Sequence, residues 1–213
     1  MNVHNPIQVK HRTSGRVLLR AAYYSFLTIG SLAIGYVAYA FVDARAYQAV
    51  AESRLADIRP TQEPRVVALG DVIGEMIIPR LNLKTIMVQG ESPKALRRAI
   101  GHLPETSLPG EPGNVAIAGH RDTFFRPLRD IQTGDAITIK TPDGEFQYQV
   151  ESTEVVLPND VQVLKPSRGN TLTLVTCFPF YYVGSAPRRF IVHARQISPP
   201  PAQSPTAQAI PRL

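Results

Sequence analysis

The chain contains a single cysteine, Cys177, inside the stretch "TLTLVTCFPF" (171–180). The alternation in this stretch predicts a β-strand whose two leucines point to one face and whose cysteine points to the other. A free cysteine usually packs as a small buried hydrophobe. At a strand end it could also react as a thiolate nucleophile. The residues of this stretch alone leave both interpretations open.

Two other side chains could assist a reactive thiol. His120 ends the apolar stretch "NVAIAGH" (114–120), and an imidazole there can protonate a leaving amine and later deprotonate an attacking one. Arg189 opens "RFIVHA", and its guanidinium offers a rigid fork of donors to an oxyanion. His102 and His193 are expected to be surface histidines with ordinary hydrogen bonds.

Short strands must position these residues. Pro93 follows the N-cap candidate Ser92, so residues 92–100 are predicted to form one short helix. An alternating pattern around a Pro-Asp-Gly turn predicts a β-hairpin over 136–156. The other predicted strands are 73–79, 83–90, 114–120, 171–177 and 189–197. This pattern is mainly β and indicates a small barrel or sandwich.

The N-terminal part indicates a membrane. Residues 21–42 carry no charge, and a helix of this length spans a hydrocarbon core of roughly 30 Å. Residues 1–20 form a basic segment with positive charges at Lys10, Arg12, Arg16 and Arg20, which favours a cytoplasmic N-terminus. We therefore expect a single-pass anchor with the rest of the chain outside the cytoplasm. A cleaved signal peptide is the alternative, since Ala-Tyr-Ala at 38–40 resembles a cleavage site.

The remaining segments flank a folded domain at 71–197. Residues 43–70 are expected to form a polar helical stalk and a linker with prolines at its end. Residues 198–213 are Pro-rich without periodicity and are expected to be a disordered tail.

Composition restricts the classes of function. Four of the net +6 charges lie in the first twenty residues, so the high pI reflects a basic terminus, and no nucleic-acid partner is predicted. One cysteine excludes an intrachain disulfide and a multi-cysteine zinc site. The five histidines lack metal-ligand spacing, so we predict no metal and no cofactor.

Taken together, these segments resemble the sortase family. "TLVTC" (173–177) matches the family pattern Thr-Leu-x-Thr-Cys, and "RFIV" (189–192) resembles its arginine strand. "AGHRDTFFRPL" (118–128) is similar to its histidine segment, and "GHLPETSLPGEPGN" (101–114) to the segment before it. The resemblance covers about residues 71–197, and the short connection between cysteine and arginine looks most like the class D branch.

The resemblance implies a fold and an activity. The fold would be an eight-stranded β-barrel with short helices, preceded here by the transmembrane helix. The enzyme would be a cysteine transpeptidase that cleaves a Leu-Pro-x-Thr-Gly-like or -Ala-like sorting signal through a thioacyl intermediate. Cys177 would be the nucleophile, His120 the general acid and base, and Arg189 the oxyanion or substrate clamp, with Arg188 as the fallback if the strand register is shifted by one.

The resemblance also implies partners. The substrates would be surface proteins with C-terminal sorting signals, and the acceptor an amine of a cell-wall precursor or a pilin lysine. Asp122 could complete a triad, although we favour a hydrogen bond from a neighbouring backbone amide to its side chain.

Two other interpretations remain. A different cysteine enzyme of the cell wall, such as an L,D-transpeptidase, would carry a His-Gly-Cys-like signature, whereas Cys177 follows a threonine. A non-enzymatic β module on a membrane stalk would bury Cys177 as a structural residue.

Overall fold

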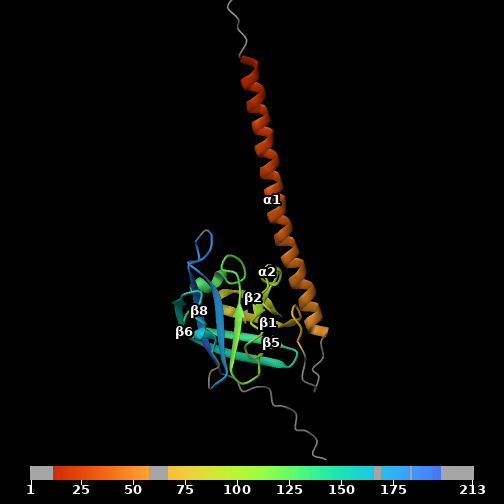
Figure 1. The fold of residues 1–213 in the computed structure, drawn as a ribbon. Coiled ribbons are helices and arrows are strands. Elements are labelled where there is room, and N and C mark those ends of the chain that lie inside the picture. Colours follow the sequence, from red (N-terminus) through yellow and green to blue (C-terminus); the bar gives the residue numbers. More distant parts are fainter. Residues whose placement is uncertain (1–11, 58–66, 166–168, 183, 198–213) are drawn as a thin grey trace, which may run out of the picture. The chain divides into compact units, whose positions relative to one another are not determined.

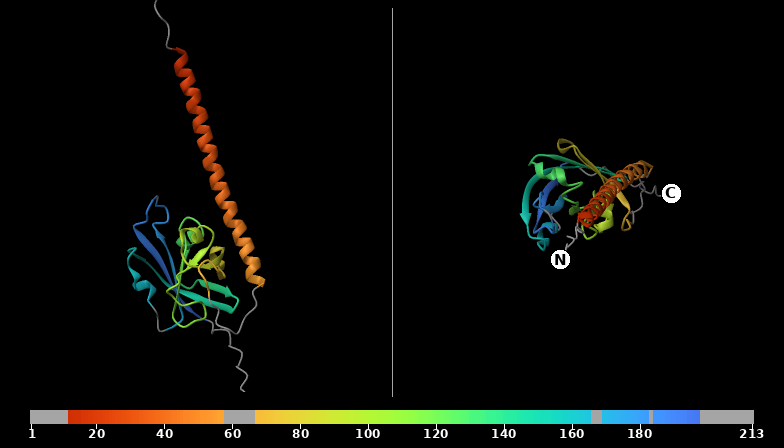
Figure 2. Two further views of the ribbon diagram at one scale, coloured as in Figure 1. Left: turned by 45° about the vertical axis from the view of Figure 1, so that its right-hand side comes forward. Right: turned by 90° about the horizontal axis from the view of Figure 1, so that it is seen from above.

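The computed structural model of the chain describes residues 12–57, 67–165, 169–182 and 184–197. The predicted disordered tail at 198–213, the prolines of the predicted linker and the first eleven residues of the basic terminus lie outside these ranges. The described elements are one long helix and a closed barrel of eight strands with short helical turns (Figures 1 and 2).

Helix α1 (Arg12–Asp57) includes the uncharged segment and extends beyond it. Large apolar side chains such as Phe26, Leu32 and Ile34 are exposed on it. A helix that is apolar on all faces favours a lipid environment over water. Among the described residues, α1 is the one helix long and apolar enough to cross a membrane, and a signal sequence near an N-terminus would meet the same test.

The C-terminal part of α1, residues 44–57, packs on the barrel. Ala51 is buried in a small apolar cluster with Ile86, Val88 and Ala99. The Gln48 side chain accepts a hydrogen bond from the Ile86 amide (2.8 Å) and donates one to the Arg98 carbonyl (2.6 Å). This part of the helix, expected from sequence to be a polar stalk, therefore contributes to the fold of the barrel.

The barrel is closed in the strand order β1-β2-β3-β4-β7-β8-β6-β5. Two neighbouring pairs, β2 with β3 and β4 with β7, are parallel, and the other pairs are antiparallel. The strands are β1 (Val72–Ile78), β2 (Leu83–Gln89), β3 (Ile100–His102), β4 (Asn114–Ala118), β5 (Ala136–Thr141), β6 (Gly144–Val156), β7 (Thr171–Phe178) and β8 (Arg188–Gln196). The prediction of an eight-stranded barrel is confirmed.

Alternating side chains of these strands fill the barrel. The inward residues form one continuous apolar core, and the hairpin predicted over 136–156 is present as β5 and β6, which pair from Thr141↔Gly144 onward. The short helical turns lie between strands: α2 (Pro93–Leu96) and the 3-10 helices η1 (Pro79–Leu81), η2 (Arg126–Asp130) and η3 (Val161–Leu164).

Two local predictions near β3 were wrong. The helix expected over 92–100 is only the four-residue α2, capped by the Ser92 hydroxyl, because the following residues pair with β2 and β4. His102, expected at the surface, is fully buried. Its ring nitrogens contact Gln89 Oε1 (2.8 Å) and the Ser107 carbonyl (2.9 Å). Burial lowers the pKa of the His102 imidazole.

A buried carboxylate connects η1 to the turn before β5 through hydrogen bonds. Asp135, at the start of β5, accepts hydrogen bonds from Arg80 of η1 (2.6 Å to Nη2) and from the Gln132 amide (2.8 Å). Asp135 is buried while the Arg80 guanidinium is partly exposed. The hydrogen bond from Arg80 holds the pKa of the Asp135 carboxyl below its usual range.

We predict that Asp135→Asn lowers the free energy of unfolding by about 1–3 kcal/mol at neutral pH, because an amide cannot accept from Arg80 as an anion does. A carboxyl with a lowered folded pKa stabilises above its unfolded pKa, and this stabilisation is lost as the pH falls through the folded pKa. The difference between the wild type and the variant should therefore narrow below about pH 4. Urea unfolding at pH 7 and pH 3 measures both effects.

Asp143→Asn is the control, because Asp143 is exposed in the β5–β6 turn. An equal loss of stability in this control, or a difference for Asp135→Asn that stays constant in acid, would contradict the assignment.

Candidate active site

The predicted site residues lie on, or directly after, three neighbouring strands. Cys177 on β7 lies directly opposite Arg189 on β8, which places their Cβ atoms about 5 Å apart. On its other side β7 runs parallel to β4, with Ala118 level with Val175. His120 follows two residues after Ala118, and Cys177 two residues after Val175.

Cys177 and Arg189 also share a face of the sheet. Even-numbered residues of β7 and β8, such as Leu174 and Val192, lie in the core. The odd-numbered Cys177 and Arg189 therefore point outward. In β4 the inward residues are odd-numbered, as Ile117 shows. His120 lies two residues beyond the end of β4 and is half-buried.

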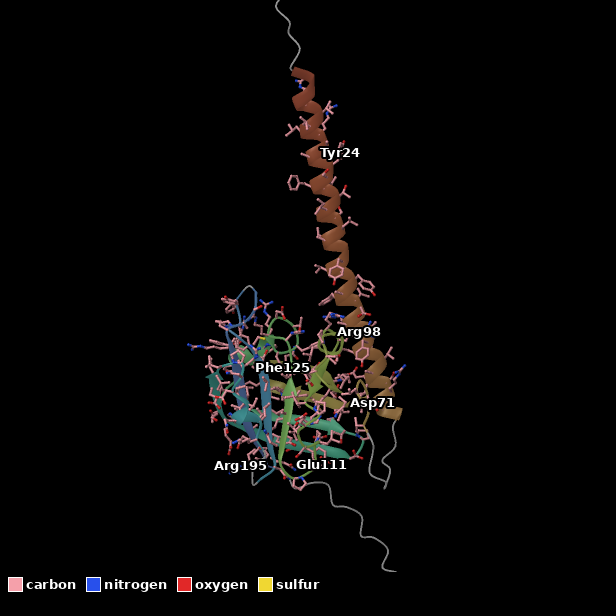
Figure 3. The ribbon with its side chains drawn as sticks, viewed as in Figure 1. Tyr24, Asp71, Arg98, Glu111, Phe125 and Arg195 are labelled. Carbon is pink, nitrogen blue, oxygen red and sulfur yellow. The ribbon has the colours of Figure 1, made fainter. Side chains whose placement is uncertain are left out.

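Contacts behind His120 fix where its backbone leaves β4. The Gly119 amide donates to the Val175 carbonyl (3.1 Å), and the Thr176 hydroxyl donates to the Gly119 carbonyl (2.8 Å). A Cβ at Gly119 would lie 2.6 Å from the ring of Phe125, so only glycine allows this buried ring to close the barrel end (Figure 3). The His120 carbonyl accepts from the Phe125 amide (3.0 Å) and closes the turn.

Cys177 is partly accessible near the end of β7, and aromatic rings fill the barrel behind this strand end. Cys177 is half-buried. Phe178, Phe180 and Phe190 pack ring against ring, with centroids 5.3–6.3 Å apart. Phe180 and Phe190 pack against the barrel core, whereas the half-buried thiol points to the outer face.

The structure places Arg188 and Arg189 in different surroundings. Arg189 is half-buried, and its Nη1 donates to the carbonyls of Ala186 (3.3 Å) and Arg188 (3.0 Å). Arg188 is exposed and pairs with Phe178, not with Cys177. Asp122 is exposed on the turn after His120, and the described residues provide no backbone amide that donates to its carboxylate.

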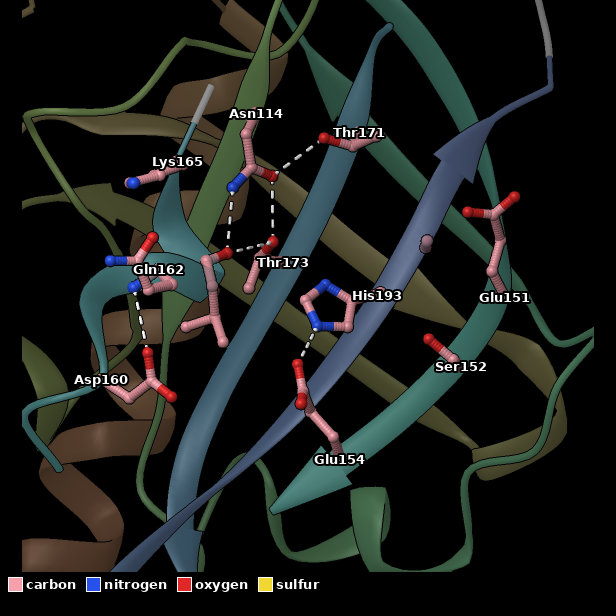
Figure 4. A pocket seen from close by; sticks show the side chains of 12 residues that line it. Asn114, Glu151, Ser152, Glu154, Asp160, Gln162, Lys165, Thr171, Thr173 and His193 are labelled. Atoms are coloured by element: carbon pink, nitrogen blue, oxygen red, sulfur yellow. Dashed lines mark hydrogen bonds and ion pairs between the residues drawn. The ribbon is translucent and has the colours of Figure 1, made fainter. Parts of the chain in front are cut away.

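A polar pocket of about 510 Å³ lies further along the same outer face. It begins at the cross-strand pair Thr173–His193, four residue pairs from Cys177–Arg189 along β7 and β8 (Figure 4). His193, expected at the surface, is half-buried, and its Nε2 contacts Glu154 (2.8 Å). Asn114 accepts from the hydroxyls of Thr171 and Thr173 (3.1 and 2.9 Å). The Asn114 amide and the Thr173 hydroxyl also donate to the Val163 carbonyl (3.4 and 3.3 Å), which attaches η3 to the strands. None of the three predicted site residues lines the pocket.

Sequence reasoning missed the contacts between the two loops that border the site. Arg121 and Arg129, which follow His120, contact Tyr182 and Tyr181 in the β7–β8 connection. The only signal in the sequence was the adjacency of each group to a predicted site residue. Spacing along the chain does not reveal which arginine meets which tyrosine.

Comparison with known proteins gives a consistent result. The sortase domain family matches residues 76–197. Among curated relatives, Sortase D of Bacillus subtilis is 32% identical over 130 residues, which cover 61% of this chain and 66% of the relative. Sortase SrtE1 of Streptomyces coelicolor is 29% identical over 221 residues, which cover 91% of this chain and 62% of the relative. The matches thus span slightly less than two thirds of the length of these relatives.

Solved structures share the fold. A Clostridium perfringens Sortase D5 transpeptidase has a TM-score of 0.57 and 34% identity, over 62% of this chain and 83% of that one. Sortase E from Streptomyces avermitilis has a TM-score of 0.53 and 29% identity, over 62% of this chain and 91% of that one.

Proposed function

The chain belongs to the sortase family, and on this premise we propose that it is a membrane-anchored cysteine transpeptidase. It cleaves a Leu-Pro-x-Thr-Gly-like or -Ala-like sorting signal, forms a thioacyl-enzyme and transfers the acyl group to an amine. The observation that carries the proposal is the alignment of β4, β7 and β8, which supports a common site for Cys177, Arg189 and His120.

The proposed reaction consists of two acyl transfers. In the first, the Cys177 thiolate attacks the threonine carbonyl, the C–N bond breaks, and protonated His120 gives its proton to the departing amine. In the second, neutral His120 takes a proton from the incoming amine as that amine attacks the thioester, and Cys177 leaves as a thiolate. The histidine returns to its starting state, so each cycle balances in protons.

Arg189 is proposed to stabilise the oxyanion that forms in both transfers. Its position opposite Cys177 supports this role. A guanidinium has five N–H donors, and the contacts to Ala186 and Arg188 use only Nη1. Nε and Nη2 are therefore the donors available to a developing negative charge.

The proposed location is the cell membrane, with one transmembrane segment at 21–42 and the catalytic domain outside the cytoplasm. The long apolar helix α1 supports an anchor and also fits a signal sequence. The proposed partners are surface proteins with C-terminal sorting signals and an amine acceptor, either a cell-wall precursor or a pilin lysine.

The competing function is a non-enzymatic β module on a membrane stalk, with Cys177 as a structural residue. Half-burial of the thiol and the arginine opposite it favour the enzyme. We predict that Cys177→Ala abolishes transfer of a Leu-Pro-x-Thr-x peptide to an amine and leaves the melting temperature nearly unchanged, because one partly exposed sulfur atom is lost. Mass spectrometry of the products from a peptide library measures transfer and also identifies the motif.

Transfer at the wild-type rate by Cys177→Ala would disprove the enzyme mechanism. Unfolding of this variant would support the structural role of the cysteine.

We predict that Arg189→Ala slows acylation roughly 100- to 1000-fold, the cost of losing one preorganised oxyanion donor. Arg189→Lys should recover little, because an ammonium cannot reproduce the guanidinium fork. Arg188→Ala is the matched control and should acylate at nearly the wild-type rate, since Arg188 lies on the opposite face of β8. Single-turnover acylation rates decide the question, and a stronger effect at Arg188 would refute the assignment.

We predict that the full-length protein stays with the membrane fraction during carbonate extraction, because 22 uncharged residues anchor it. Release by carbonate would argue against an anchor. A mature N-terminus near residue 41 would show that the segment is a cleaved signal peptide.

A further inference from the structure

Arg121 connects the histidine segment to the chain between Cys177 and Arg189. Its Nη2 donates to the carbonyls of Tyr182 (2.6 Å) and Gly184 (3.0 Å), and its guanidinium lies over the Tyr182 ring, 5.8 Å from the centroid. Both carbonyls belong to exposed residues of the β7–β8 connection. One side chain therefore joins the residue after His120 to the connection that leads into Arg189.

A second pair strengthens this connection. Arg129 of η2 donates to the Tyr181 hydroxyl and lies over the Tyr181 ring, 5.7 Å from its centroid. Two arginines of the segment that follows β4 thus contact consecutive tyrosines of the segment that follows β7. Backbone pairing between β4 and β7 ends at Ala118 and Val175. Beyond the strand ends, these side chains supply hydrogen bonds and ring contacts between the two segments.

The Arg121 guanidinium is held there at a cost. Its Nη1 is buried and has no hydrogen-bond partner among the described residues. An unsatisfied buried donor is unfavourable by about 1–3 kcal/mol, and the carbonyls that Arg121 binds could be hydrated, since their residues are exposed. The arginine is therefore a weak contributor to stability, which makes a purely structural role a poor explanation for it.

We propose that Arg121 is a positioning residue of the transfer reaction, which holds His120 in register with Cys177 by fastening the histidine turn to the β7–β8 connection. The inference rests on the proposed function. Because Arg121 directly follows His120 in the chain, a shift of its Cα carries the backbone of the histidine with it. A displacement of about 1 Å in a catalytic group can cost on the order of 100-fold in rate, so the effect should fall on kcat more than on KM.

The test uses the full-length protein in detergent and the peptide-to-amine transfer assay. Arg121→Met keeps the length of the side chain and removes the guanidinium. We expect a kcat about 10- to 100-fold lower, a KM close to that of the wild type, and a melting temperature within about 4 °C of it. Arg126→Met is the matched control, because Arg126 is an exposed arginine of the same segment, and it should behave as the wild type.

A double-mutant cycle isolates the contact. Tyr182→Leu removes the ring under the guanidinium and should lower kcat about 2- to 5-fold, the contribution of an exposed cation–π pair. Adding Tyr182→Leu to Arg121→Met should lower kcat no further, because the two changes break one contact.

Three results would overturn the inference: a wild-type kcat for Arg121→Met, an equal loss for Arg126→Met, or multiplied losses in the double variant. If Arg121→Met does not fold, Tyr182→Leu decides: a lower kcat at an unchanged melting temperature supports the inference, and an unchanged kcat overturns it. Cys177→Ala assayed in parallel distinguishes this failure from failure of the proposed function. Should that variant transfer as fast as the wild type, the proposed function fails and the positioning role fails with it.

Discussion

The register of β7 between β4 and β8 is the constraint on which the candidate site depends. Side chains alternate along a strand, so a shift of one residue would turn Cys177 into the core and expose Leu172 and Leu174. The fully buried leucines make that shift costly. The same register therefore fixes both the packing of the core and the outward position of the thiol. The alignment of Cys177 with Arg189 follows from this register.

The site lies where regular structure ends on two of the three strands. His120 lies two residues beyond β4, and Cys177 is followed within two residues by the end of β7. Such positions combine a rigid scaffold with neighbouring loops, where binding and catalytic residues are often found. Gly119 and Phe125 hold the exit from β4, because the buried ring occupies the space that a Cβ at position 119 would need. The backbone path from the end of β4 to His120 is thereby fixed.

The C-terminal part of α1 packs on the barrel away from the candidate site. Gln48 satisfies one amide and one carbonyl of the barrel, and Ala51 fills a small apolar cluster beside β2. Lys84 on β2 contacts both Glu52 of the helix and the buried Glu75 of β1. Burial raises the pKa of the Glu75 carboxyl, while Lys84 lowers the pKa of Glu52. Residues 44–57, which were expected to form a stalk outside the folded domain, are thereby packed as part of the barrel.

The sequence by itself determined the strands with clear alternation, the hairpin at 136–156 and the apolar helix, because each of these follows from side-chain periodicity or length along the chain. Its motifs also indicated the sortase family and drew attention to Cys177, His120 and Arg189. It did not indicate β3, which is only three residues long and owes its strand conformation to its neighbours β2 and β4. It also missed the burial of His102, because its partners Gln89 and Ser107 come from separate segments.

Only the tertiary structure shows that Arg189, and not Arg188, lies opposite Cys177, and only there do Arg121 and Tyr182 meet. Both outcomes depend on pairing between segments far apart in the chain. Periodicity within one strand does not specify the register against its neighbour, because that register is chosen by the core that both strands enclose.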